Sequence, residues 1–178
     1  NIEPLSNADI LSADLIFISA MDVQRASVRQ ITRRCKQLGA RIVAGGPLFT
    51  GEYEDFPEID HFVLNEGEIT FPQFLTDWQN GNPRSIYQTS DYADMTQSPL
   101  PRFELLDLSA YDSMGIQFTR GCPYNCDFCN VTALLGHKPR LKTAAQIIAE
   151  LDALYHLGWR RNIFFVDDNF IGNKRALK

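Results

Sequence analysis

Short apolar runs alternate with helical stretches along the first half of the chain. Residues 15–19, 41–44 and 60–64 are mostly apolar, as expected for strands buried on both faces of a parallel sheet. Between the first two runs, residues 23–38 show a helical period of apolar positions, which ends at Gly39. With a short helix after the second run, this alternation predicts an open parallel α/β sheet.

Two further helices complete the first half. Residues 6–11 predict a short helix before the first strand, and an apolar face after the third strand predicts a longer helix that Gly81 closes. Cys35 lies on the apolar face of the helix predicted over residues 23–38. We therefore interpret Cys35 as a small core residue and not as a metal ligand.

The second half predicts one βαβ unit. Residues 113–119 form a predicted strand, residues 143–158 a helix with a capping-box start, and residues 162–166 a second strand. The segment between the halves is rich in Ser, Thr, Asp and Pro, with an isolated edge strand predicted at residues 85–87. We divide the chain into a first domain, a linker and a second domain, over residues 1–81, 82–112 and 113–178.

Composition narrows the class of protein. The chain has 178 residues, of which 44% are hydrophobic and 22% charged, as in ordinary globular domains. Its net charge is −5 and its basic residues form no stripe, so we expect no nucleic-acid partner. No apolar run approaches the length needed to cross a bilayer, and the cysteine content favours a reducing cytoplasm.

Three of the four cysteines lie in one loop. Cys122, Cys126 and Cys129 have the spacing C-x3-C-x2-C, and Gly121 and Pro123 keep the segment out of a helix. Thiolates are soft metal ligands, so three in one loop predict a common metal centre. A 4Fe–4S cluster normally takes four cysteines. Three would leave one iron open to a small molecule, which favours catalysis over electron storage.

Two other interpretations of these cysteines stay open. A zinc site could use His137 or Asp127 as a fourth ligand, although zinc sites usually have a second ligand pair far downstream. Disulfides would require a secretory context, which nothing in the sequence suggests.

With Phe128 directly before the last cysteine, the loop resembles the signature of the radical S-adenosylmethionine (SAM) superfamily. The resemblance implies that the three thiolates hold a 4Fe–4S cluster, that SAM chelates the fourth iron and that Phe128 lies near the adenine. It also implies a partial β/α barrel that opens with this loop. Asp167, Asp168 and Asn169 follow the second strand of the unit, where the family binds the amino group of SAM. A plain turn is the alternative interpretation of these three residues.

The order of the two domains resembles the cobalamin-binding radical SAM enzymes, close to the hopanoid methylases. In that family a Rossmann-like domain before the cluster loop holds cobalamin. The resemblance implies a cobalamin pocket at the ends of three strands, formed by Ser19, Gly45, Gly46, Pro47, Glu66 and Gly67. The cobalt-ligating D-x-H-x-x-G motif is absent, and we interpret His61 as structural.

The expected fold class is α/β: the C-terminal part of a Rossmann-like (flavodoxin-like) cobalamin-binding domain, followed by the first βαβ unit of a radical SAM partial barrel. The expected function is that of a cobalamin-dependent methyltransferase that acts on an unactivated carbon through a deoxyadenosyl radical. The alternatives are a radical SAM enzyme with another outcome, such as cyclisation or methylthiolation, and a non-catalytic iron–sulfur or zinc module.

The expected partners are a small-molecule substrate, which could be lipid-like, and an electron donor for the cluster. A final helix is predicted to begin at residues 173–178. We expect residues 1–178 alone to be inactive and to self-associate. The reason is that one barrel-facing surface would lack partners, formed by Ile116, Phe118, Phe164 and Val166.

Overall fold

The computed structural model describes residues 5–170, which divide into two compact units that meet in the sequence between Ala93 and Asp94. The helix predicted at residues 173–178 lies outside the described residues. Among the helices that are described, none is long and apolar enough to cross a membrane.

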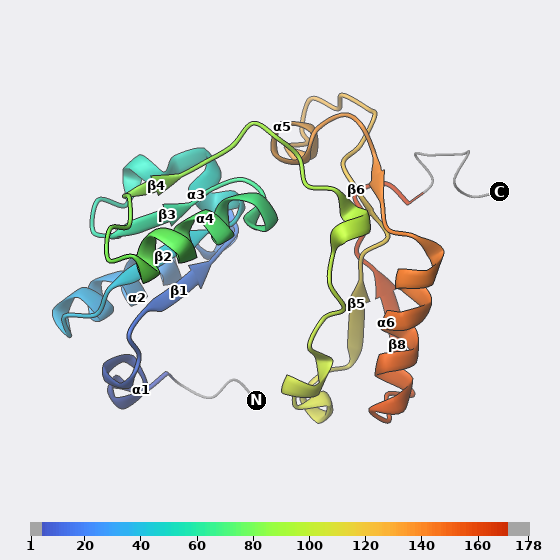
Figure 1. The fold of residues 1–178 in the computed structure, drawn as a ribbon, viewed down its shortest axis with the longest axis horizontal. Helices are drawn as coiled ribbons and strands as arrows, with labels where there is room; N and C mark the ends of the chain where they lie inside the picture. Colours follow the sequence, from blue (N-terminus) through green and yellow to red (C-terminus); the bar gives the residue numbers. More distant parts are fainter. Residues whose placement is uncertain (1–4, 171–178) are drawn as a thin grey trace. The chain divides into compact units, whose positions relative to one another are not determined.

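The first unit is a parallel four-stranded sheet with helices in the connections (Figure 1). Its strands follow one another in the order of the sequence: β1 (Ile16–Ser19), β2 (Ile42–Gly45), β3 (His61–Val63) and β4 (Ile86–Tyr87). Its helices are α1 (Asn7–Ser12), α2 (Arg25–Gln37), α3 (Pro47–Glu52) and α4 (Gly67–Gln79), with short 3-10 turns at Asp22–Gln24 and Tyr53–Asp55. The predicted alternation of strands and helices is confirmed.

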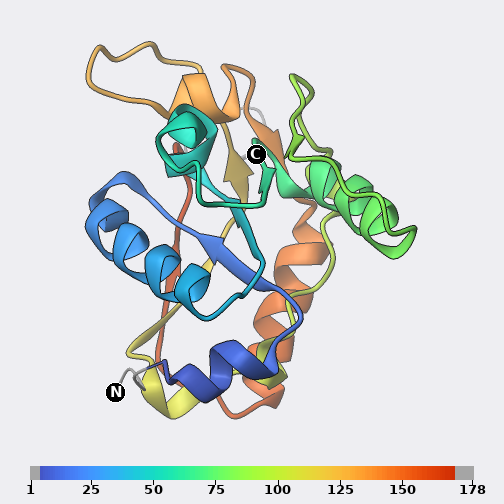
Figure 2. The same cartoon turned by 90° about the vertical axis from the view of Figure 1, so that its left-hand side faces the viewer.

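The two faces of this sheet have separate cores. Successive residues of β2 point to opposite faces. Ile42 and Ala44 pack in the cluster under α2 and α3, whereas Val43 packs with Phe74 of α4 on the other face. Figure 2 shows α2 and α4 on opposite sides of β1. Cys35 is 0% exposed within the α2 core, so its interpretation as a core residue is confirmed.

The second unit is built around two paired parallel strands, β5 (Ser113–Ile116) and β8 (Asn162–Phe165). Helix α6 (Ala144–His156) connects them and starts with the predicted capping box, in which Thr143 and Gln146 bind each other's backbone. A separate antiparallel pair, β6 (Thr119–Arg120) and β7 (Arg140–Leu141), encloses helix α5 (Val131–Leu135). Short 3-10 turns precede β5 at Met95–Gln97, Phe103–Leu105 and Leu108–Ala110.

The strand predicted over residues 113–119 is interrupted, which corrects the sequence prediction. The β5 strand ends at Ile116, and the chain turns out of the sheet before it pairs with β7. Ile116 is 1% exposed and packs with Leu154 of α6, so its assignment to an uncovered barrel face was wrong. Phe164 and Val166 are 64% and 46% exposed, in keeping with the predicted uncovered face.

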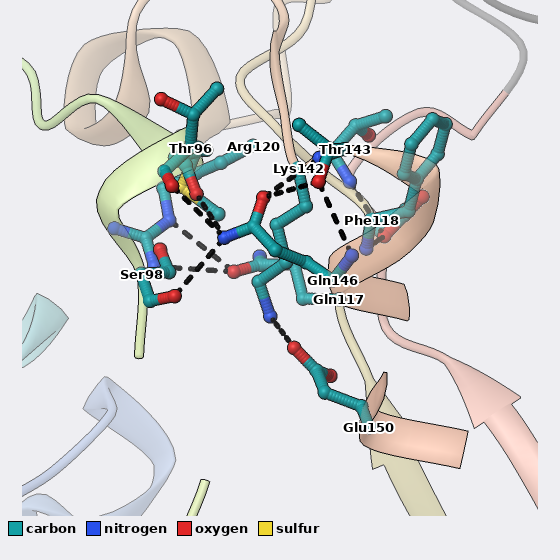
Figure 3. A network of polar contacts seen from close by, with 12 residues as sticks. Thr96, Ser98, Gln117, Phe118, Arg120, Lys142, Thr143, Gln146 and Glu150 are labelled. Carbon is teal, nitrogen blue, oxygen red and sulfur yellow. Dashed lines mark hydrogen bonds and ion pairs between the residues drawn. The ribbon is translucent and has the colours of Figure 1, made fainter. Parts of the chain in front are cut away.

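The segment predicted as a linker is divided between the two units. On one side, β4 completes the first sheet, and the backbone N–H of Ala93 donates to Glu66 Oε2 at 2.8 Å. On the other side, Phe103 packs in the core of the second unit. The side-chain amide of Gln146 donates to three backbone carbonyls of one short segment at 3.0–3.2 Å, those of Met95, Thr96 and Ser98. Figure 3 shows the Gln146 side chain pointing toward Thr96 and Ser98.

Candidate functional site

The cysteine loop leaves the end of β6 and runs to α5. Cys122 and Cys129 are half-buried, Cys126 is exposed, and all three thiols are free. Phe128 is 91% exposed, so its ring is available to a ligand. The loop lies beyond the carboxyl end of β5, which is where open α/β sheets and barrels place their ligand sites.

The three thiols do not share a centre in this structure. Among residues 5–170, no three His, Cys, Asp or Glu side chains form a group that could hold a metal ion. The donor set nevertheless fits an iron–sulfur cluster, because three free thiols in one loop supply soft ligands and leave one coordination position open. The loop must close around the metal for all three to bind it.

Backbone contacts fix the start of the cysteine loop, at Gly121 and Cys122. Gly121 has a φ of 91°, and a Cβ atom at this position would lie 3.0 Å from each of three carbonyl oxygens. These carbonyls belong to Leu135, Gly136 and Lys138, in the segment between α5 and β7. The backbone N–H of Cys122 donates to the Gly136 carbonyl at 3.2 Å. The first cysteine therefore starts from a defined position that only glycine permits beside it.

The acidic turn after β8 binds the backbone of the segment that leads into the cysteine loop. Asp167 Oδ1 accepts hydrogen bonds from the N–H groups of Phe118 and Thr119 at 2.7 and 3.0 Å. Asp168 Oδ2 accepts one from Gly121 at 2.9 Å. These bonds explain why the β5 strand does not continue to residue 119, since the amides of Phe118 and Thr119 donate to a side chain. Asp167 Oδ2 is buried and has no hydrogen-bond partner among the described residues.

A buried ion pair lies in the same unit, beneath the turn that carries Gln146. Lys142 Nζ is 2.6 Å from Glu150 Oε1, and the two side chains are 9% and 4% exposed (Figure 3). The backbone N–H of Lys142 also donates to the Phe118 carbonyl at 2.9 Å, which extends the pairing of β6 and β7 by one residue in each strand. This pair was not predicted from the sequence, because eight positions separate the two residues and no helical spacing joins them.

A cavity of about 380 Å³ opens at the carboxyl edge of the first sheet. It brings together four of the six residues expected to bind cobalamin: Ser19, Gly45, Gly46 and Gly67. The two adjacent glycines let the backbone approach closely, because an added Cβ would lie 2.6 Å from the Val63 carbonyl oxygen at Gly45 and 2.8 Å from Ser19 Oγ at Gly46. The rest of the wall was not predicted from the sequence and is apolar except for Asn65; it includes Phe17, Val43, Val63 and Phe71.

The structure places the other two expected residues outside the cavity lining. Glu66 is 3% exposed, and its carboxylate binds the Ala93 backbone. Pro47 is the first residue of α3, where its fixed φ suits a helix start. His61 Nδ1 lies 2.7 Å from the Arg84 carbonyl oxygen, and its ring contacts Phe74, which fits its interpretation as structural.

Comparison with known families matches both halves of the chain. The B12 binding domain family matches residues 3–75, and the radical SAM superfamily matches residues 116–177. The hopanoid C-2 methylase of Rhodopseudomonas palustris is 37% identical over 180 residues, which cover 99% of this chain. The chain belongs to the cobalamin-binding radical SAM family. Its two units are thus a cobalamin-binding domain and the start of a radical SAM domain.

Two further proteins are similar to this chain over most of its length. An uncharacterized methyltransferase of Synechocystis is 43% identical over the whole chain. The radical SAM methyltransferase TsrM of Kitasatospora setae superposes with a TM-score of 0.67 at 18% identity, over 90% of this chain and 38% of that one. The chain spans about a third of the length of its curated relatives, 34% of the first two.

Proposed function

We propose that the whole protein is a cobalamin-dependent radical SAM methyltransferase that acts on an unactivated carbon of a small molecule. The observation that carries the proposal is the occurrence, in one chain, of a three-cysteine loop beyond β5 and an apolar cavity at the carboxyl edge of a B12-type sheet. Hopanoids are named as the substrate of two relatives, a C-2 and a C-3 methylase, which favours a lipid-like substrate.

Each cofactor has proposed residues in this chain. Cys122, Cys126 and Cys129 would hold the 4Fe–4S cluster, and Phe128 would lie against the adenine of SAM. Asp167 keeps one carboxylate oxygen without a donor among the described residues, which supports a role toward the SAM amino group. When bound, the cluster and SAM would supply a deoxyadenosyl radical, and cobalamin would supply a transferable methyl group. An electron donor must reduce the cluster, and the free thiols favour a reducing cytoplasm.

The test of this function uses the reconstituted full-length protein with reductant, SAM that is isotopically labelled in its methyl group, and candidate lipids. Formation of deoxyadenosine together with a labelled methylated product supports the proposal. Deoxyadenosine without methyl transfer would favour another radical outcome, such as cyclisation or methylthiolation. A cluster that never cleaves SAM would favour an electron-transfer module.

Blocking the cavity tests the cobalamin assignment. Gly67 lines the cavity at the first position of α4, and an added Cβ there meets no atom within 4 Å. Gly67→Trp should therefore fill the cavity mouth without backbone strain and weaken cobalamin binding about 100-fold, roughly 2.7 kcal/mol. Iron content should not change. Binding is measured by titration of the apoprotein with hydroxocobalamin.

The matched control for this variant is Gly51→Trp. Gly51 is also exposed and helical, and an added Cβ there also meets no atom within 4 Å, but it does not line the cavity. Gly51→Trp should bind cobalamin as the wild type does. Equal affinities for the two variants would show that cobalamin binds elsewhere.

A further inference from the structure

Asn169, the third residue of the turn after β8, contacts a cysteine and not only the backbone of the loop. Its side-chain Nδ2 lies 3.6 Å from Cys122 Sγ. This distance is within hydrogen-bonding range for sulfur, which is larger than oxygen. A thiolate only accepts hydrogen bonds, so the amide must present its NH2 group to it. Both residues are half-buried, which limits competition from water.

The position of Asn169 is fixed from two sides. Thr119 is 0% exposed, and its hydroxyl donates to the Asn169 carbonyl at 3.4 Å. The ring of Phe170 packs against Phe118 and Phe165, with ring centroids 5.9 and 5.2 Å apart. The amide is therefore directed at the sulfur by the fold and does not reach it by chance from a free side chain.

The three side chains of the turn contact the segment from Phe118 to Cys122 in the order of the sequence. Asp167 binds the two amides before the loop, Asp168 binds Gly121 and Asn169 binds Cys122. The contacts thus advance along the loop as they advance along the turn. This register places the amide of Asn169 opposite the first proposed cluster ligand.

We infer that Asn169 is a positioning residue for the cluster, which orients Cys122 and raises the reduction potential of the cluster bound there. The inference rests on the proposed function, in which Cys122 is a ligand. Reduction adds negative charge that is shared with the ligand sulfurs, so a hydrogen bond to Sγ is stronger in the reduced state. An amide that donates to this sulfur therefore favours reduction, the step that precedes SAM cleavage.

Removing the donor should lower the potential. We propose Asn169→Leu, which lacks the amide, and Asn169→Asp, which lacks the donor and adds a charge. In the reconstituted full-length protein without SAM, reduction of both variants should become about tenfold less favourable, a shift of about 59 mV to more negative potential for one electron. The potential is measured by a redox titration followed by electron paramagnetic resonance, with iron and sulfide quantified in each sample.

The matched control is Asn162→Asp. Asn162 is exposed at the first position of β8, whereas Asn169 lies in the turn beyond the last residue of that strand. This variant therefore introduces the same charge at the end of β8 that faces away from the turn. Its potential should equal that of the wild type. Unchanged potentials in both Asn169 variants would overturn the inference, as would a shift in Asn169→Asp without one in Asn169→Leu, since charge alone would then explain it.

A measurement on the wild type covers the case in which the variants lose their cluster. Protein labelled with ¹⁵N in the asparagine side chains should show a ¹⁵N coupling to the reduced cluster in pulsed electron paramagnetic resonance. Absence of that coupling in a protein with a full cluster overturns the inference and leaves the proposed function intact. A wild-type protein that binds no cluster overturns both.

Discussion

Cys126→Ala should leave the full-length protein without its iron, its broad visible absorption and its cleavage of SAM. The proposed site supplies only three protein ligands, and a 4Fe–4S cluster normally takes four. The loss of one of the three is therefore expected to remove the cluster and not merely to weaken its binding. Cys126 is exposed, and its replacement should not disturb the fold. Iron and sulfide analysis after anaerobic reconstitution, with unfolding followed in parallel, separates loss of the cluster from loss of the protein.

The control for this experiment is the fourth cysteine. Burial raises the pKa of the Cys35 thiol and so disfavours the thiolate that a metal would need. Cys35→Ala should keep the wild-type iron content, while the small cavity it leaves lowers the free energy of unfolding by about 1 kcal/mol. Iron loss in Cys35→Ala, or tightly bound zinc without iron uptake in the wild type, would contradict the assignment of the three-cysteine loop.

Lys142→Met should destabilise the second unit by about 3–5 kcal/mol, because it leaves the carboxylate of Glu150 buried without its partner. The double variant Lys142→Met/Glu150→Leu should recover most of the loss, since an apolar pair of similar volume avoids the buried charge. Each unit contains one of the two tryptophans, Trp78 and Trp159. Denaturant unfolding followed by Trp159 fluorescence in a Trp78→Phe background therefore reports on the second unit alone.

An exposed ion pair in the same unit provides the comparison. Arg102 and Glu104 form an ion pair with side chains 72% and 47% exposed, and exposed pairs contribute about 0–1 kcal/mol. Arg102→Met should therefore change the stability far less than Lys142→Met. Similar losses in the two single variants would mean that water reaches Glu150 and that the buried pair is not energetically distinct.

The sequence predicted the first unit well because its signals are local. Apolar runs flanked by helical periods identified β1, β2 and β3, and Gly39, with a φ of 75°, ends the long helix where the pattern indicated. The edge strand β4 was found from two apolar residues within a polar segment. Each of these features depends on residues that are adjacent in the chain.

Predictions in the second unit failed where distant residues decide the structure. The β5 strand stops because the carboxylate of Asp167, some fifty positions later, accepts the amides of Phe118 and Thr119. The pair of β6 and β7 has two residues in each strand, too few for a periodic signal. Asp167 and Asp168 were found as candidates from their position after a strand, but their bonds to the cysteine loop could not be read from spacing.

The hydrogen bonds on either side of the boundary between the units have a consequence for limited proteolysis. A protease must draw an extended stretch of chain into its active site, so cleavage follows backbone that can detach locally. Here the Glu66 carboxylate accepts a hydrogen bond from the Ala93 amide. The Gln146 side chain donates hydrogen bonds to the carbonyls of Met95, Thr96 and Ser98. The Ser-, Thr- and Asp-rich composition around residue 94 suggests an easily cut tether. These anchors should instead make it resistant, and Gln146→Ala should expose it to cleavage.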